Sequence, residues 1–445
     1  MAARQHKQWS VSTPGRFEPG VKFIVIGSGV IGVTTAYFLR EFGHDVTVID
    51  REPAAGRGAS FANGGLLTPS MSEPWNAPGC WLALLSSLGR SDAALQLRWR
   101  ALPGLARWGV GFLRNSTAAR FDRSTASNLR LALHSLDTMR SLRQRIEVDY
   151  GNAAHGTLRL FRTAAALDRA TRAAERRSSE GLGFRRLSSV EVVELEPALE
   201  SLRDQLVGGL HYQVDESGDA RLFCEALATR ARCNGVEFRF GIDASSFRIR
   251  SNRIASVVCR QEEFVADRYV VAAGSYSSAL LSTAGVYVPV HPVKGYSITI
   301  EQFRCRRTLR IPILDDDLHA AVTPLGASIR VAGTAEFAAF DQSLVPARNR
   351  KLVSLLKAIL PDLEYDPSVV RQWCGLRPVC SDGVPIIGQT AIANLLVNTG
   401  HGPLGWTMAA GSAHLLAQMT SGTAIQIDSA PYSLARFGLS RGMTR

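Results

Sequence analysis

Residues 21–50 read VKFIVIGSGVIGVTTAYFLREFGHDVTVID, and this stretch decides the fold of the N-terminal part of the chain. Residues 21–26 form a short apolar run with β-branched side chains, which is typical of a buried strand, and the run ends at a glycine-rich turn. A helical pattern follows and closes at Gly43, and residues 45–49 then indicate a second buried strand with Asp50 at its tip. The stretch therefore predicts a complete βαβ unit of a parallel sheet.

The glycines inside this unit have the spacing of a dinucleotide-binding turn. Gly27 would make the tight turn, Gly29 would let the backbone approach a pyrophosphate, and Gly32 would let the helix pack closely on the strand. Asp50, 18 residues after Gly32, is placed to accept hydrogen bonds from an adenosine ribose. The alternative is a glycine-rich turn in some other parallel sheet. We expect the following residues to contact the dinucleotide: Gly27, Gly29, Val30, Ile31, Gly32, Asp50 and Arg51.

The long loop after the second strand extends this expected contact. Residues 56–78 are rich in glycine, serine, asparagine and proline, and they include the segment SFANGGL at residues 60–66. A loop of this length and small side chains suits a backbone that runs along a large flat cofactor. The expected contacts in this loop are Ser60, Asn63, Gly64, Gly65 and Leu66.

Two motifs near the C-terminus predict a carboxylate site beside a cofactor ring. Gly375-Leu376-Arg377-Pro378 is typical of a rigid turn, which would aim a planar guanidinium at a small carboxylate; the alternative is a structural arginine that caps the turn. Residues 398–407, NTGHGPLGWT, combine a glycine-rich turn with the start of a helix, so free N–H groups and a positive helix end would face an electron-rich group. The expected cofactor contacts here are Gly402, Leu404, Gly405, Trp406 and Thr407.

The remaining segments predict a second lobe that interrupts the nucleotide-binding fold twice. Residues 79–205 are mostly helical in pattern, whereas residues 286–331 contain several strand-like segments. A hairpin is expected at Ser251-Asn252, and residues 267–275 indicate a buried strand that stops at a glycine turn. The fold is therefore predicted to be α/β, with a Rossmann-like domain interleaved with an α+β substrate domain.

This interpretation divides the chain into several segments. The predicted boundaries are a flexible arm at 1–20, a nucleotide-binding domain at 21–78, 219–285 and 371–429, a substrate-binding domain at 79–218 and 286–370, and a C-terminal tail at 430–445. With 445 residues, the chain is too long for one ordinary domain.

Composition restricts the class of protein further. The chain is 46% hydrophobic and 20% charged, has no long apolar run and shows no signal peptide, so a cytoplasmic location is expected. Its seven cysteines lack any Cys-x-x-Cys pair, which argues against a disulfide framework and a zinc site. The net charge of +12 would suit nucleic acid or anionic lipid, but the arginines are dispersed. This distribution favours a basic surface suited to anionic substrates, with no nucleic-acid partner.

Six separated segments, in order along the chain, carry a resemblance to a known family. They are residues 60–65 (SFANGG), 73–79 (EPWNAPG), 292–297 (PVKGYS), 331–336 (VAGTAE), 375–378 (GLRP) and 398–402 (NTGHG) together with 404–407 (LGWT). In these segments the chain resembles the FAD-dependent D-amino-acid oxidase/glycine oxidase superfamily, most closely its D-amino-acid dehydrogenase branch of the small subunit type. The resemblance spans residues 23–422.

The resemblance implies FAD bound non-covalently in an extended form, with Arg377 gripping the substrate carboxylate. It also implies cofactor contacts from Ala273 and Gly274 and, near the adenine, from Ala244. Two departures from the branch stand out. Pro403 replaces a small polar residue and has no N–H to donate, and Asp243-Ala244 replaces a more usual Pro-Val.

The implied reaction is oxidative deamination of D-amino acids to 2-oxo acids and ammonia by hydride transfer from Cα to the flavin N5. Cyclic D-imino acids such as D-proline or hydroxy-D-proline are one candidate substrate class. The expected catalytic residues are Arg377, His401, Tyr296 and His319, and no metal is expected. His401 would tune the flavin or accept a proton, with a structural role as the alternative; packing is the alternative for Tyr296 and His319.

The electron acceptor that the branch implies is a quinone or another respiratory carrier. Residues 95–114 mix tryptophan, phenylalanine and arginine, which is compatible with peripheral contact at the inner face of the cytoplasmic membrane; a packed helix pair broken at Pro103 and Gly104 is the alternative. Other functional alternatives are an oxygen-using glycine/sarcosine-type oxidase, and a flavoprotein subunit of a larger dehydrogenase or RNA-modifying complex.

Overall fold

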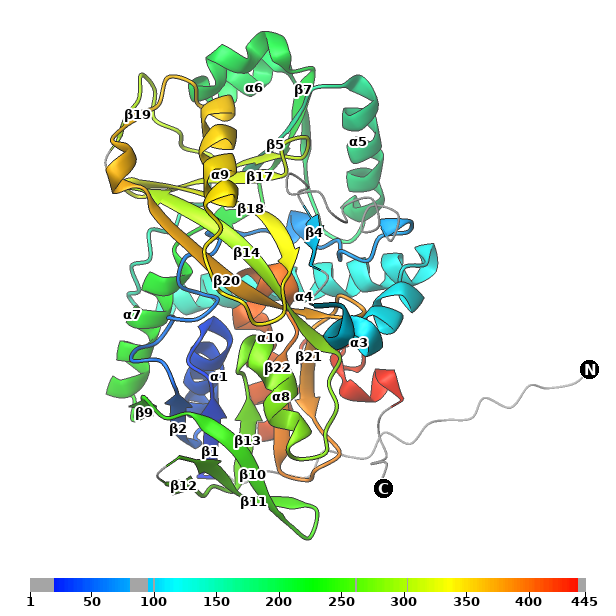
Figure 1. Ribbon diagram of the computed structural model, residues 1–445, viewed down its shortest axis with the longest axis vertical. Coiled ribbons are helices and arrows are strands. Elements are labelled where there is room, and N and C mark those ends of the chain that lie inside the picture. The colour runs from blue at the N-terminus through cyan, green and yellow to red at the C-terminus, as the bar shows by residue number, and fades with distance from the viewer. Residues whose placement is uncertain (1–19, 81–94, 99–100, 261, 302, 439–445) are drawn as a thin grey trace, which may run out of the picture.

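The computed structural model describes residues 20–438, apart from residues 81–94, 99–100, 261 and 302. Two large β-sheets occupy the two halves of an elongated molecule, and helices pack on and between them (Figure 1). The chain crosses between the halves more than once, so each sheet takes strands from widely separated segments. The predicted interleaved α/β fold is confirmed. The predicted arm at 1–20, except for Gly20, and the last tail residues, 439–445, lie outside the described residues.

The six-stranded sheet, here called the first sheet, has the order β21-β22-β13-β1-β2-β9. Its strands are β1 (Lys22–Ile26), β2 (Asp45–Asp50), β9 (Glu237–Phe240), β13 (Arg268–Val271), β21 (Ile386–Gln389) and β22 (Leu395–Thr399). All neighbours are parallel except β21, which is antiparallel to β22. Helix α1 (Val30–Glu41) connects β1 to β2, so the predicted βαβ unit is confirmed.

Both faces of the first sheet are covered, which explains why β1 is apolar along almost its whole length. On one face, α1 packs with α4 (Ala118–Arg145), α7 (Ala220–Cys233) and α10 (Gly405–Ser421) in one continuous hydrophobic core. On the other face lie α8 (Ser277–Ser282) and a small sheet of β10 (Ala244–Arg250), β11 (Arg253–Cys259) and β12 (Glu263–Phe264). Ser251 and Asn252 both have positive φ, as a two-residue hairpin turn requires, so the predicted hairpin is confirmed.

The nine-stranded sheet, here called the second sheet, has the order β20-β14-β18-β17-β16-β5-β7-β6, and β4 also pairs with β18. Its strands are β4 (Leu95–Leu97), β5 (Thr157–Phe161), β6 (Arg185–Ser188), β7 (Gly208–Tyr212), β14 (Val290–Ile300), β16 (Ile313–Asp315), β17 (Ala320–Leu325), β18 (Ser328–Phe337) and β20 (Arg371–Cys380). Helix α9 (Pro346–Ile359) packs against its centre and builds a second hydrophobic core with it.

Shorter elements connect these layers. The other helices are α3 (Leu102–Arg114), α5 (Ala164–Ser178) and α6 (Ser189–Leu195). Two small strand pairs join β3 (Leu66–Leu67) to β8 (Glu216–Ser217) and β15 (Phe303–Arg304) to β19 (Glu364–Tyr365). The 3-10 turns are η1 (Pro69–Met71), η3 (Pro197–Gln205), η4 (Gly274–Tyr276), η5 (Pro367–Val369), η6 (Gly402–Leu404), η7 (Ala430–Tyr432) and η8 (Leu434–Phe437).

The segment 95–114 differs from the predicted helix pair. It contains β4 followed by one helix, α3, and Pro103 lies in the first turn of α3, where a missing N–H and a fixed φ are tolerated. Trp99 and Arg100 lie outside the described residues. Within α3, Trp108 and Phe112 are buried, whereas Val110 and Leu113 are half exposed.

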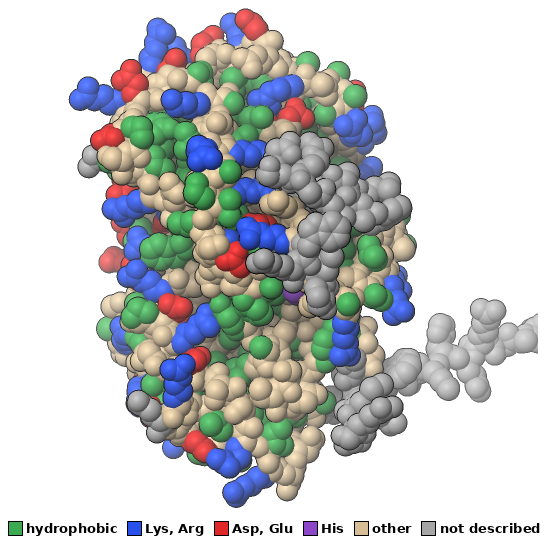
Figure 2. Space-filling model, viewed as in Figure 1, with side chains coloured by type: hydrophobic (Ala, Val, Ile, Leu, Met, Phe, Trp, Pro, Cys, Tyr) green, Lys and Arg blue, Asp and Glu red, His purple; other side chains and the backbone are tan. Residues whose placement is uncertain are grey.

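Lysine and arginine side chains are scattered over the face of the molecule that Figure 2 shows, rather than gathered into one patch. The dispersed sequence pattern of the basic residues therefore persists on this face. Among the helices that the structure describes, none combines the length and the apolar character that crossing a bilayer requires.

Candidate active site

A cavity of about 1290 Å³ is lined by residues of both sheets. On the first sheet it lies at the carboxyl ends of β1, β2, β13 and β22, and on the second sheet it is lined by β14, β18 and β20. The carboxyl edge of a parallel sheet is where open α/β folds bind their ligands. The volume exceeds the roughly 300–1,000 Å³ of an ordinary small-molecule site, so there is room for a large cofactor and a second small molecule.

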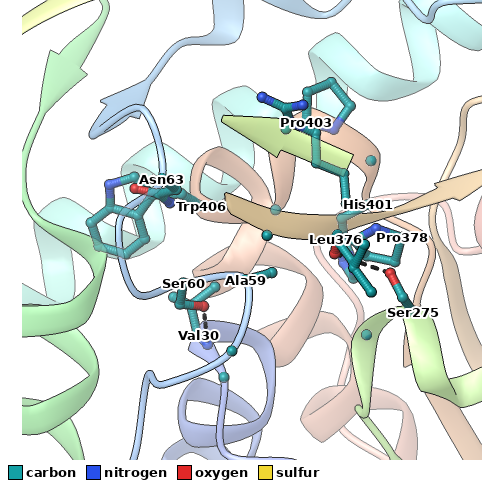
Figure 3. Close-up of a pocket in the computed structure, with 18 of the residues that line it drawn as sticks. Val30, Ala59, Ser60, Asn63, Ser275, Leu376, Pro378, His401, Pro403 and Trp406 are labelled. Atoms are coloured by element: carbon teal, nitrogen blue, oxygen red, sulfur yellow. Dashed lines mark hydrogen bonds between the residues drawn. The ribbon is translucent and has the colours of Figure 1, made fainter. Parts of the chain in front are cut away.

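The glycine turn between β1 and α1 lines the cavity, and Figure 3 shows Val30, the first residue of α1, beside Ser60. Gly27 has a φ of 109°, which favours glycine. A Cβ at Gly32 would lie 1.8 Å from the carbonyl oxygen of Gly27, so the helix can approach the strand only without a side chain there. At Gly29 the nearest atom to such a Cβ is the hydroxyl of Ser60 at 3.5 Å, and that hydroxyl accepts a hydrogen bond from the Val30 N–H.

Most of the residues predicted to bind a cofactor line this cavity. These are Gly27, Gly29, Val30, Ile31, Asp50, Arg51, Ser60, Asn63, Gly64, Leu66, Ala244, Ala273, Gly274, Gly402, Leu404, Gly405 and Trp406. Gly32, Gly65 and Thr407 do not line it. Gly32 instead packs against the glycine turn, and the Thr407 hydroxyl accepts a hydrogen bond from the Thr68 N–H.

Asp50 is held by the glycine turn itself. Its Oδ2 accepts hydrogen bonds from the N–H and the hydroxyl of Ser28, and its Oδ1 accepts from the N–H of Glu52. These contacts fix the carboxylate at the tip of β2, where it lines the cavity beside Arg51.

The C-terminal glycine turn contains two elements where the sequence predicted one helix start. Residues 402–404 form η6, and α10 begins only at Gly405. The N–H of Leu404 donates to the carbonyl of His401, so it is not free for a ligand as expected. Pro403 fits the first turn of η6, because that position needs no N–H donor.

Arg377 lies in the middle of strand β20, not in a turn, which corrects the sequence interpretation. The strand is at the edge of its sheet, and an edge strand tolerates Pro378. The guanidinium donates to the carbonyl of Thr334 at 3.3 Å. No carboxylate of the described residues lies within ion-pair distance of it, and burial lowers the pKa of Arg377 to about 10.

Two glycines explain how this side chain lies in the cavity. Gly295 of β14 and Gly375 of β20 are directly paired. A Cβ at Gly295 would fall 2.0 Å from Nη1 of Arg377, and a Cβ at Gly375 would fall 2.1 Å from the ring of Trp373. The guanidinium and the indole therefore lie flat over a floor made of backbone. Trp75 adds an aromatic ring 5.7 Å from the guanidinium carbon.

The carbonyl that holds Arg377 belongs to an irregular position in β18. The pairing of β14 with β18 shifts between Gly295 and Tyr296, which leaves Thr334 as an extra residue with a φ of 58°. Such a bulge turns the local backbone, and bulges are common beside active sites. A β-branched residue is strained at this φ, so the carbonyl is aimed at Arg377 at some cost in free energy.

His401 is buried at the start of η6 and lines the cavity. Its Nε2 lies 3.1 Å from the hydroxyl of Ser412, which itself donates to the carbonyl of Met408. A serine proton engaged with that carbonyl favours the tautomer in which Nε2 of His401 carries the ring proton and donates to Ser412. Burial lowers the pKa of His401 to about 3, so the ring is neutral at ordinary pH.

Tyr296 lines the cavity, but its hydroxyl is already engaged. It donates at 2.6 Å to the buried carboxylate of Glu336, which also forms an ion pair with Arg98. Burial and this hydrogen bond raise the pKa of Tyr296. These contacts favour the packing alternative for Tyr296.

His319 also lines the cavity, although its position differs from the prediction. It lies in the turn between β16 and β17 and not on a strand, with a φ of 51° and an exposed side chain. The neighbouring Asp315 and Asp316 are paired with Arg162 and Arg159. His319 therefore belongs to the rim of the cavity.

Sequence reasoning missed the aromatic and bulge residues around Arg377. The missed lining residues include Trp75, Phe112, Thr334, Phe337 and Trp373. Trp75 and Thr334 lie inside motifs that carried the family resemblance, so those motifs held a signal. Trp373 is two residues before Gly375 on the same face of β20, and only knowledge of the strand would have revealed it.

The residues present fit an FAD molecule. The cavity is lined by a glycine turn in which Gly27 and Gly32 leave no room for a side chain, by the fixed carboxylate of Asp50, and by the partly buried guanidinium of Arg377, which has no ion-pair partner among the described residues. The fold and the cavity together are those of a dinucleotide-binding protein, with a guanidinium in the same cavity.

The comparisons with known proteins identify the family. The chain matches the FAD dependent oxidoreductase family over residues 22–419 and belongs to it. It is 40% identical over 417 residues to a D-amino acid dehydrogenase of Cereibacter sphaeroides, covering 94% of this chain and 95% of the relative. It is also 40% identical over 409 residues to a D-amino acid dehydrogenase of Dechloromonas aromatica, covering 90% and 97%.

Solved structures share the fold. Glycine oxidase from Geobacillus kaustophilus matches with a TM-score of 0.71 at 22% identity, over 94% of this chain and 99% of that one. L-proline dehydrogenase from P. horikoshii matches with a TM-score of 0.73 at 18% identity, over 95% and 99%. The predicted family, fold class and FAD cofactor are confirmed, and the protein is an FAD-dependent oxidoreductase.

Proposed function

We propose that the protein is a D-amino-acid dehydrogenase, which converts D-amino acids to 2-oxo acids and ammonia. Relatives that carry this name are about 40% identical over nearly the whole chain. The observation that carries the proposal is Arg377, a partly buried guanidinium that lines the cavity and has no carboxylate partner among the described residues. A planar cation of this kind is suited to a bidentate grip on an α-carboxylate.

The chain's own residues would orient the substrate and exclude water. The paired glycines let Arg377 lie flat, and Thr334 holds it from one side, so a bound carboxylate is fixed in direction. Fixing one end of a small substrate converts an encounter into a reactive geometry. Trp75, Trp373 and Phe337 line the space around that end and would exclude water from it.

FAD, when bound, accepts the two electrons and the hydrogen that leave the substrate. Beside it, His401 supplies a neutral imidazole and not a cation, because burial keeps its pKa far below neutral pH. Tyr296 keeps its proton on the hydrogen bond to Glu336. The substrate amine must therefore arrive neutral or lose its proton to water, and Arg377 remains the main binding group.

We also propose the finer assignments that the branch implies. The aromatic walls suit an apolar side chain or ring, which agrees with cyclic D-imino acids such as D-proline as one substrate class. A quinone or another respiratory carrier would take the electrons, with peripheral contact at the cytoplasmic membrane. The half-exposed Val110 and Leu113 on α3 are apolar groups available for such contact.

An anaerobic bleaching screen tests the function. Purified FAD-loaded protein is mixed with D- and L-amino acids, including D-proline, and flavin absorbance is followed. We expect bleaching by D-amino acids, with little or none by their L-enantiomers. Aerobic turnover should reduce a quinone analogue without forming stoichiometric peroxide. Bleaching by glycine or sarcosine with peroxide formation, or no bleaching by any D-amino acid, would contradict the proposal.

A further inference from the structure

Three consecutive carbonyl groups of the loop after β2 are each held by a side chain of the second sheet. Ser297 donates its hydroxyl to the carbonyl of Ala62 at 2.6 Å, and Thr323 donates its hydroxyl to the carbonyl of Gly64 at 2.7 Å. Between them, Nη1 of Arg330 donates to the carbonyl of Asn63 at 3.3 Å.

The three donors come from adjacent strands. Ser297 is on β14, Arg330 on β18 and Thr323 on β17, and Thr323 is the direct pairing partner of Arg330. Arg330 is itself fixed by Thr299 on β14 and by an ion pair of 2.9 Å with Asp219, both with little exposure. The donors are therefore rigid parts of one sheet.

The geometry of the peptide bond also fixes the directions of the N–H groups in this loop. In a trans peptide the C=O and the N–H point in opposite directions. Because the carbonyls of Ala62 and Asn63 point toward the second sheet, the N–H groups of Asn63 and Gly64 point away from the side chains that hold those carbonyls. Both residues line the cavity, and neither N–H has a hydrogen-bond partner among the described residues.

We infer that Ser297, Thr323 and Arg330 are positioning residues, which orient the 62–65 loop so that the N–H groups of Asn63 and Gly64 donate to acceptor atoms of the FAD ring. The same sheet carries Arg377 on β20, two strands from β18. One rigid sheet therefore sets both the direction of the substrate carboxylate and the donors that face the cofactor. A further N–H, that of Gly65, is retained within the loop by the Asn63 side chain at 3.0 Å.

Two variants that each remove one hydroxyl test this inference, Ser297→Ala and Thr323→Val. Freed from its donor, a carbonyl can rotate and carry its N–H away from the ring. We expect the dissociation constant for FAD, measured by titrating the apoprotein, to rise about tenfold in each variant. The flavin midpoint potential should become more negative, because N–H donors stabilise the negative charge of the reduced ring.

Conservative variants provide the rescue. Ser297→Thr and Thr323→Ser retain a hydroxyl and should restore FAD affinity and potential to near the wild-type values. Ser328→Ala is the matched control, because that hydroxyl is on β18 but donates to the carbonyl of Leu325 in its own hairpin. It should leave both values unchanged. Denaturant unfolding of each variant confirms that it is folded, and Thr323→Ala replaces Thr323→Val if the latter is not.

Wild-type FAD affinity and potential in both folded hydroxyl-deletion variants would overturn the inference, and so would equal changes in Ser328→Ala. Neither readout involves an amino acid. A negative result here therefore leaves the proposed dehydrogenase activity standing, and a failed substrate screen leaves this inference standing.

Discussion

Arg377 can occupy its position only because its neighbour Gly295 has no side chain. Its guanidinium lies where a side chain at Gly295 would be, 2.0 Å from the place of a Cβ, and β14 cannot move because it is paired on both sides. The guanidinium is at the end of a flexible side chain, so a methyl group there would displace it. The proposed grip on the substrate therefore depends on two residues on different strands.

We therefore predict that Gly295→Ala lowers kcat/KM by about 100-fold, because a charged hydrogen-bonded grip of roughly 3 kcal/mol is lost. Steady-state kinetics and the flavin spectrum provide the measurement. FAD content should stay at the wild-type level, and Arg377→Ala should show the same phenotype. Full activity in Gly295→Ala would mean that the guanidinium does not bind the substrate from this position.

At the scale of elements, the bulge in β18 combines a strained backbone conformation at Thr334 with a hydrogen bond to Arg377. Thr334 has a φ of 58° and its buried hydroxyl has no hydrogen-bond partner among the described residues, so the residue type contributes little to stability there. Its carbonyl nevertheless holds Arg377. Strain of this kind is expected where the backbone must present a group at a particular angle.

Thr334→Gly should separate the effect of backbone strain on stability from the effect of the Arg377 hydrogen bond on substrate binding. Glycine adopts this φ without strain but loosens the bulge, so we expect the free energy of unfolding to stay equal or rise by up to about 1 kcal/mol. We expect KM for the substrate to rise severalfold, because the carbonyl no longer holds the guanidinium firmly. Urea unfolding and kinetics measure the two quantities. A loss of stability together with unchanged KM would contradict this account of the bulge.

The secondary-structure elements also differ in how well the sequence predicts them. The βαβ unit was predictable because glycine spacing, strand pattern and Asp50 all belong to one local stretch. Gly375-Leu376-Arg377-Pro378 was misread as a turn, since glycine and proline usually mark turns. Here glycine makes room for the Trp373 ring, and proline lies on an edge strand. Contacts such as Thr323 to Gly64 join residues far apart in the chain, so no local pattern reveals them.

At the scale of the whole molecule, the Arg330–Asp219 ion pair joins the two halves. Asp219 caps α7 with Oδ1 while Oδ2 pairs with Arg330, and both side chains are buried. Asp219→Asn keeps an oxygen for the cap but leaves Arg330 without an anionic partner. We predict a loss of about 3 kcal/mol in the free energy of unfolding, measured in urea.

Asp168→Asn is the control for this prediction. Asp168 pairs with Arg186 on the surface, with both side chains more than 40% exposed. Its replacement should cost less than about 0.5 kcal/mol. Equal losses in the two variants would show that burial does not increase the contribution of the Arg330–Asp219 pair to the free energy of unfolding.

Acid should destabilise the whole protein through its buried histidines. Burial lowers the pKa of His401 to about 3 and the pKa values of His291 and His414 to about 4. Below about pH 6.5 the unfolded chain binds protons at these residues and the folded protein does not. The free energy of unfolding should therefore fall as pH decreases from 6.5 toward 4, by about 1.4 kcal/mol per pH unit for each residue.

Urea unfolding at pH 7 and pH 5 measures this slope. His414→Gln should make it shallower, whereas His155→Gln, at an exposed position, should leave it unchanged. An identical slope in wild type and His414→Gln would show that His414 is already protonated in the folded protein.

One connection between the two halves has a consequence for recombination among relatives. Strand β20 leaves the second sheet at Cys380, and the chain then forms β21 and β22 of the first sheet before it reaches His401, which pairs back with Val379. Arg377, the proposed substrate-binding residue, and the glycine turn at residues 400–405 thus lie on one continuous segment of chain whose two ends are paired. A chimera that exchanges residues 371–405 as a block should inherit both groups in register, whereas a crossover inside the block would separate them.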